Sequence, residues 1–110
     1  KKRITLVNKP LRNPDIVWRV EKRRQAEVMK ALENGEDADD SGTVILLLSG
    51  MMHQLNLVGG LIWQQCDGAQ TLSGIAEQLA REFSVETAEV EADVAEFVAD
   101  LAERGWLING

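Results

Sequence analysis

The sequence predicts an α+β, winged-helix-like domain, in which a three-stranded antiparallel sheet is followed by three helices. Three observations lead to this prediction. Apolar and polar residues alternate over residues 15–23, as in a strand with one buried face. The apolar run Thr43–Leu48 is joined to Met51–Leu55 by the dipeptide Ser49-Gly50, as in a β-hairpin. From Leu57 onward, apolar residues recur at helical spacing between capping residues.

The first predicted strand follows a basic amino-terminal segment. Residues 1–13, with proline at position 10 and again just beyond them, predict an extended or looped segment with at most a short strand at Ile4–Val7. In the predicted strand itself, Ile16, Trp18 and Val20 share one face, which is typical of a half-buried strand. We therefore expect the folded domain to occupy residues 14–110.

Residues 24–42 form a long excursion between the first two predicted strands. Within it, Gln25–Glu33 has the composition for two helical turns. The residues that follow, NGEDADDSG, are acidic and contain no hydrophobic residue larger than alanine. Because such a stretch buries too little apolar surface to offset the entropy of ordering it, we expect a mobile connection.

Two short helices are predicted after the hairpin. Asn56 is suited to cap a helix over Leu57–Cys66, because its side-chain oxygen accepts from a free amide of the first turn. The Gly59-Gly60 pair costs helix stability, and it favours a site where a neighbouring backbone comes close. Thr71 caps a second helix that continues to Phe83.

The third predicted helix, about Glu86–Arg104, divides its residues among three faces. One face is apolar and one is rich in alanine. The flank between them carries five acidic residues: Glu89, Asp93, Glu96, Asp100 and Glu103. Gly105 ends the helix, and the following WLIN is suited to a short closing strand.

The charge of the chain is distributed unevenly, and this argues against nucleic-acid binding. Ten of the 12 basic residues lie within residues 1–30, and nine of the 18 acidic residues lie between positions 71 and 104. Phosphate contacts by Lys and Arg supply most nucleic-acid affinity, and the net charge here is −6. No apolar run is long enough to span a membrane, and a single cysteine forms no internal disulfide. We expect a cytoplasmic protein.

Residues capable of chemistry are few, and none completes a catalytic, metal or cofactor site. A nucleophilic pair of Cys66 with His53 would need an orienting third group, and zinc would need further ligands. The Gly59-Gly60 pair lacks both phosphate-loop patterns. The acidic stretch within residues 33–42 lacks the calcium-loop pattern. We expect His53 to be a half-exposed strand residue and Cys66 a packed thiol, and we expect no enzyme activity and no cofactor.

Several stretches together resemble the PqqD-like peptide chaperones, which are recognition elements for ribosomally made, post-translationally modified peptides. These are MHQLN, IWQQCDG, TLSGIAEQLAREF and EADVAEFVADLAERGWL, and the likeness extends over about residues 13–108. RNPDIVW and MHQLN…IWQQCDG look most like the subgroup associated with GeoRSP peptide-maturation systems. The long excursion departs from the tight first turn of the family.

The resemblance implies a non-catalytic domain that binds the leader of a precursor peptide and presents it to a radical-SAM maturase. In the family, the leader adds as a strand beside the third strand and lies against the last helix. Carried over, one wall of the groove is Met51, Met52, His53, Gln54 and Leu55. The other wall offers, as exposed or half-exposed candidates, Asp93, Phe97, Asp100, Leu101 and Arg104.

Two other classes of function share this order of elements. A winged-helix DNA-binding regulator would need basic residues on its recognition helix, and the last helix here is mostly acidic. A structural or assembly subunit of a maturation complex would need no leader groove. The sequence favours peptide binding over both, because the third strand is expected at a sheet edge, where an extended peptide can add.

Overall fold

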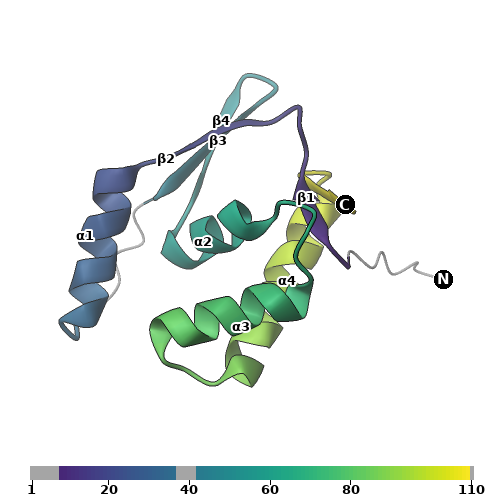
Figure 1. Ribbon diagram of the computed structural model, residues 1–110. Helices are drawn as coiled ribbons and strands as arrows, with labels where there is room; N and C mark the ends of the chain where they lie inside the picture. Colours follow the sequence, from purple (N-terminus) through teal and green to yellow (C-terminus); the bar gives the residue numbers. More distant parts are fainter. Residues whose placement is uncertain (1–7, 37–41, 110) are drawn as a thin grey trace. The chain divides into compact units, whose positions relative to one another are not determined.

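The computed structural model describes residues 8–36 and 42–109, and these divide into two compact units (Figure 1). We call residues 14–61 the sheet unit, and residues 1–13 together with 62–110 the helical unit. Each unit is described by itself. The expected division into a segment 1–13 and a domain 14–110 remains a prediction.

The sheet unit contains the predicted three-stranded antiparallel sheet. Its strands are β2 (Val17–Val20), β3 (Val44–Leu48) and β4 (Met51–Leu55), and they lie in the order β2-β3-β4. All neighbours are antiparallel. The predicted α+β fold with a three-stranded antiparallel sheet is therefore confirmed.

The turn between β3 and β4 explains why these strands form a tight hairpin. Ser49 and Gly50 both have positive φ angles, 51° and 77°. Two successive residues in this region form the turn whose twist matches that of paired strands. The turn pairs Leu48 with Met51 and thereby sets the register of the whole ladder.

A helix comes close to the start of β3 at one of the paired glycines, and the nearest atoms there belong to side chains and not to the backbone that was expected. Helix α2 spans Leu57–Gln65, and Asn56 Oδ1 accepts from the Gly59 amide at 2.9 Å, as predicted for a cap. A Cβ atom on Gly60 would lie 2.8 Å from both Thr43 Oγ1 and Val44 Cγ2. Only glycine fits there without a shift of these two side chains or of the helix.

The excursion after β2 begins with a helix that is longer than the two turns expected. Helix α1 spans Lys22–Glu33, so it begins three residues before the expected stretch and makes three turns. Val28 is buried on this helix, and Met29 and Leu32 are half-buried, so the helix has an apolar side to anchor it. Residues 37–41 of the expected mobile connection lie outside the described residues.

In the helical unit, α3 (Leu72–Phe83) packs against α4 (Thr87–Glu103). Thr71 caps α3 as predicted, because its Oγ1 accepts from the Gly74 amide at 3.1 Å. Apolar residues are buried on both helices: Ile75, Ala76, Leu79 and Ala80 on α3, and Val94, Val98 and Leu101 on α4. The five predicted acidic positions of α4 are all exposed.

Two short strands close the helical unit, and only one of them was expected. Strand β5 (Leu107–Asn109) confirms the predicted closing strand, and it pairs with β1 (Pro10–Arg12). Residues 10–12 of the segment that was expected to be extended or looped are thus a paired strand. The expected strand at Ile4–Val7 lies outside the described residues.

Side-chain bonds hold β1 in place. Arg12 donates from Nη1 to the carbonyls of Trp63 and Gln64, both at 3.0 Å. Asn13 donates from Nδ2 to the Gly105 carbonyl at 2.8 Å. Gly105, at φ 80°, also ends α4 as predicted. Through these contacts, the first and the last described residues of the chain belong to the same unit.

Candidate functional site

The free side of β4 is the first candidate surface. Within the described residues β4 is the last strand of its sheet, with a neighbour on one side only. In an antiparallel sheet, successive residues of a middle strand bond alternately to its two neighbours. The amide of Glu21 donates to the Thr43 carbonyl at 2.7 Å, on the β2 side. Leu48 and Met51 flank the two-residue loop Ser49-Gly50 and form a hydrogen-bonded pair, so the even-numbered residues of β3 bond toward β4 and its odd-numbered residues bond toward β2.

This alternation identifies the backbone groups that β4 offers to a partner. The residues of β4 paired with even-numbered positions of β3 are Met51, His53 and Leu55. These residues direct their N–H and C=O groups toward β3. Met52 and Gln54 consequently direct theirs toward the free edge, where an extended chain can pair with them.

The side chains of β4 differ in accessibility. Met51 and Met52 are 61% and 58% exposed, Gln54 is exposed and His53 is half-buried, as expected for a half-exposed strand residue. Leu55 is buried, and its carbonyl accepts from the Thr43 amide at 2.8 Å. Four of the five residues expected on this wall are therefore accessible, and Leu55 belongs to the core of the sheet unit.

Helix α4 carries the second candidate surface. The residues Asp93, Glu96, Phe97, Ala99, Asp100 and Glu103 line a hollow of about 550 Å³. Phe97 is half-buried between exposed carboxylates, so this surface combines negative charge with an aromatic ring. Such a surface suits a partner with both Lys or Arg and an apolar side chain.

Two residues expected on this second surface need separate description, because Leu101 is buried and Arg104 already contacts neighbouring side chains. Leu101 is 3% exposed, so the expectation that its side chain is accessible was wrong. It continues the buried stripe of Val94 and Val98. Arg104 forms an ion pair with Asp100 at 3.4 Å, and its guanidinium lies 5.3 Å from the centre of the Trp106 ring.

Cys66 is a structural thiol, as expected. It is fully buried, and its Sγ donates to the Ile62 carbonyl at 3.1 Å. Burial raises the pKa of the Cys66 thiol to about 12, with Arg12 acting in the opposite direction and Asp67 raising it slightly. A thiol with such a pKa is neutral at pH 7 and is a poor nucleophile.

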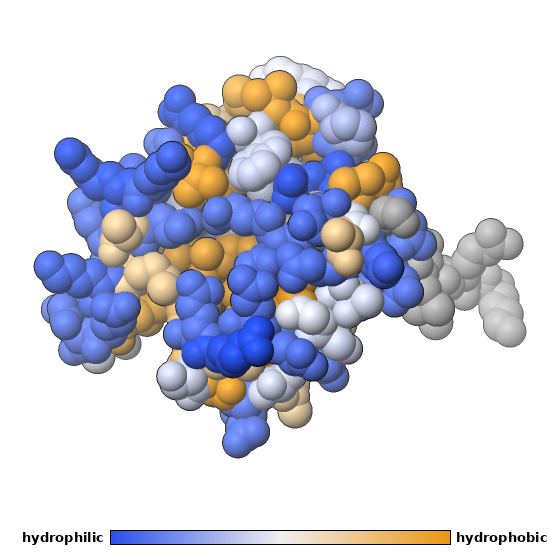
Figure 2. All heavy atoms as spheres, viewed as in Figure 1, coloured by the Kyte–Doolittle hydropathy of each residue, from blue (hydrophilic) through white to orange (hydrophobic). Residues whose placement is uncertain are grey.

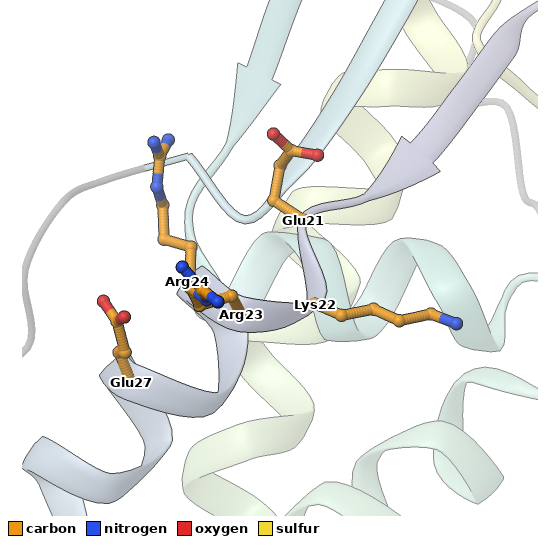
Figure 3. Close-up of a pocket in the computed structure, with 5 residues that line it drawn as sticks. All are labelled: Glu21, Lys22, Arg23, Arg24 and Glu27. Carbon is orange, nitrogen blue, oxygen red and sulfur yellow. The ribbon is translucent and has the colours of Figure 1, made fainter.

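A third hollow, of about 310 Å³, lies at the start of α1 (Figure 3) and was not predicted. It is lined by Glu21, Lys22, Arg23, Arg24 and Glu27. The side chains do not converge, since Lys22 extends away from Arg24 and Glu27 in the close-up. Arg24 donates to the Gly42 carbonyl at 3.1 Å, and this bond connects the helix to the start of β3. We assign this hollow a structural role.

Metal binding and membrane insertion find no support in the described part of the chain. No three His, Cys, Asp or Glu side chains there come together as metal ligands would. None of the helices described has both the length and the apolar character that crossing a membrane requires.

Comparison with known proteins identifies the family. The family described as Coenzyme PQQ synthesis protein D (PqqD) matches residues 28–107. A Rhodopseudomonas palustris protein named PqqA binding protein is 44% identical over 46 residues, which are 42% of this chain and 45% of the relative. A protein of the same name from Xanthomonas oryzae is 35% identical over 63 residues, covering 57% and 68%. The matches thus span about half to two thirds of these relatives.

Solved structures share the fold. The PqqD part of Methylobacterium extorquens PqqCD, described as a stand-alone RiPP recognition element, has a TM-score of 0.63 at 21% identity, over 91% of this chain and 88% of that one. Lasso peptide synthetase B1, solved with its leader peptide, has a TM-score of 0.61 at 24% identity, over 91% and 98%. Together with the family match, these findings show that the chain belongs to the PqqD family.

Proposed function

We propose that this chain binds the leader of a ribosomally made precursor peptide as an added strand at β4, and presents that peptide to a radical-SAM maturase. The observation that carries the proposal is the free edge of β4, where Met52 and Gln54 direct their backbone groups outward. The names of the relatives support it, since they are called PqqA binding proteins. Two solved structures of the same fold also contain leader peptides.

Backbone pairing supplies the affinity in this proposal. The N–H and C=O groups of Met52 and Gln54 form up to four hydrogen bonds with an added strand. Each contributes about 0.5–1.5 kcal/mol net, because the bonds replace bonds to water. Backbone pairing is indifferent to sequence, so selectivity comes from side chains next to the added strand.

We propose the α4 surface as a further contact for the leader. Asp93 and Asp100 favour a leader with Lys or Arg at matching positions, and Phe97 offers an apolar contact between them. Exposed ion pairs contribute only about 0.2–1 kcal/mol each. These carboxylates therefore adjust the association rate and the selectivity more than the affinity.

Two finer assignments belong to this proposal. RNPDIVW, at residues 12–18, and MHQLN…IWQQCDG, at residues 52–68, resemble the subgroup associated with GeoRSP peptide maturation, and on this resemblance we propose that the chain works in such a system. The absence of an internal disulfide agrees with work in the cytoplasm, where the maturase would also be found. In this role the chain supplies no catalytic group.

Calorimetric titration with the two halves of a precursor peptide tests the proposed function. The probe is a candidate precursor, taken from a short reading frame next to the gene of this chain and synthesised as separate leader and core segments. The proposal predicts binding of the leader segment and no binding of the core segment. Binding of neither segment would contradict it, as would tight, salt-dependent binding of duplex DNA used as the control ligand.

A further inference from the structure

A row of exposed apolar side chains crosses the sheet and ends at the free edge. Val17 on β2 is in register with Leu47 on β3, which is in register with Met52 on β4. Their exposed fractions are 66%, 48% and 58%. Because they are directly opposite one another on antiparallel strands, all three side chains lie on the same face of the sheet.

The row belongs to a shallow hollow on the same sheet. The hollow has a volume of about 310 Å³ and is lined by Val17, Trp18, Arg19, Ile45, Leu47 and Met52. Met52 is the one lining residue that comes from β4. On the face in view in Figure 2, hydrophobic residues reach the surface in patches among hydrophilic ones.

The register dictates what an added strand places beside Met52. Met52 directs its backbone groups toward the free edge, so it pairs directly with one residue of that strand. The two Cβ atoms of such a pair are about 4.5–5.5 Å apart and point to the same face. The next outward residue of the added strand, two positions along, lies beside Gln54. The residue between them faces the other side, next to His53.

We infer that the leader is read on this face as well, and that Met52 is a specificity-determining residue selecting a large apolar leader side chain. That side chain becomes the fourth member of the row formed by Val17, Leu47 and Met52. The leader residue two positions away, beside the polar side chain of Gln54, is polar. This inference rests on the proposed function and adds the chemistry of the peptide to it.

The leader is the occupant that fits the geometry of the row. The row is continuous with the proposed pairing edge, and the open flank of Met52 faces that edge. An added strand lies three strand spacings from β2, about 14 Å, so its side chain reaches Met52 and does not reach Val17. A folded partner or a second copy seated over the hollow would cover both residues. The two ends of the row therefore distinguish these occupants.

The test is a selection from a display library of random peptides long enough to pair with β4. It uses the wild-type chain, Met52→Thr and the matched control Val17→Thr. Both substitutions replace an exposed apolar side chain by threonine, which strands accommodate well, and thermal unfolding verifies that both variants fold. The wild type should enrich peptides with a large apolar residue at one fixed position. That preference should fall about two- to fivefold in Met52→Thr and stay unchanged in Val17→Thr.

Each other outcome overturns the inference in a distinguishable way. An unchanged preference in Met52→Thr means that the outward face does not select the peptide. A change in Val17→Thr alone means that the peptide adds at β2. Loss in both variants means that a partner covers the whole hollow, and gel filtration then shows whether it is a second copy. Failure of the wild type to enrich any peptide contradicts the proposed function itself.

Discussion

Replacing Gln54 with proline tests strand addition at β4 through a single backbone group. Gln54 directs its N–H toward the free edge, so the substitution removes a donor that β3 does not use. Proline is tolerated on an edge strand where the N–H faces solvent, and the Gln54 side chain is itself exposed. Leu55→Pro is unsuitable for the same test, because Leu55 is buried and directs its N–H toward β3, so the substitution would disturb the hairpin itself.

The expected loss follows from the bonds that an added strand makes. Removal of the Gln54 donor eliminates one backbone bond, which contributes about 1 kcal/mol net. The leader carbonyl that it served loses its partner at the newly covered edge, and this costs about 1 kcal/mol more. A total of about 2 kcal/mol corresponds to a loss of roughly thirtyfold in affinity.

Isothermal titration with the leader segment measures this loss, and Gln54→Ala is the matched control. The alanine variant also lacks the glutamine side chain, and it keeps the N–H. We expect thirtyfold weaker binding for proline, and a change of about threefold or less for alanine, in line with the contribution of one cross-strand pair. Equal affinities for the two variants, with both folded by thermal unfolding, would refute the pairing at β4.

Three further substitutions or conditions test other parts of the structure. Gly60→Ala should lower the free energy of unfolding by about 1–3 kcal/mol in denaturant titration, because its Cβ would lie 2.8 Å from two side-chain atoms. Cys66 should resist alkylation in the folded chain at pH 8. Because folding raises the pKa of its thiol from 9.0 to about 12, its contribution to stability is complete below pH 9 and is lost as the pH rises toward 12. Asp93→Asn combined with Asp100→Asn should weaken leader binding modestly and flatten the salt dependence of the association rate.

Matched variants separate these effects from general ones. Gly74→Ala places a Cβ no closer than 3.4 Å to a neighbour, so it should not destabilise, and an equal loss in both glycine variants would contradict the close approach at Gly60. In Cys66→Ala, the free energy of unfolding should fall less between pH 9 and pH 12 than in the wild type, because no thiol remains to ionise on unfolding. Glu77→Gln with Glu82→Gln on α3 changes the net charge equally, and an identical salt response would show that the α4 carboxylates have no specific role.

Local signals in the sequence were sufficient where the structure depends on neighbouring residues. Ser49-Gly50 forms the expected hairpin turn, and Asn56 and Thr71 cap the helices that they were expected to cap. Gly105 ends α4. Each of these features is decided within about four residues, so the chain itself contains the information needed to predict it.

Elements without such signals were missed or shortened. Strand β1 has three residues, begins with Pro10, and pairs with residues at the opposite end of the chain, so no local pattern marks it. Helix α1 begins after Glu21, whose side chain makes no capping bond, and its first turn contains no acidic residue. The usual indications of a helix start are therefore absent at Lys22.

The candidate site was only partly predictable for a related reason. The strand itself was identified from its sequence, and its outward backbone groups became clear from the register that the two-residue turn sets. The row containing Val17 and Leu47 depends on the same register. The one signal of this row in the sequence was Val17, an apolar residue at a position of the alternating strand that should face solvent. The structure shows that it is exposed. Leu101 was misjudged because the resemblance to the family placed it on the groove wall, although helical periodicity puts it within the buried stripe of Val94 and Val98.

Amide hydrogen exchange on the leader-bound chain tests strand addition most directly. Strand addition at β4 predicts that the amides of Met52 and Gln54 exchange more slowly once the leader segment is bound. The amides of His53 and Leu55 already bond toward β3 and should change little. Slowing at this alternate pair alone would identify the free edge of β4 as the pairing edge. Strand addition at β4 would be contradicted if protection appeared instead on β2, at Trp18 and Val20, while the amides of Met52 and Gln54 stayed unchanged.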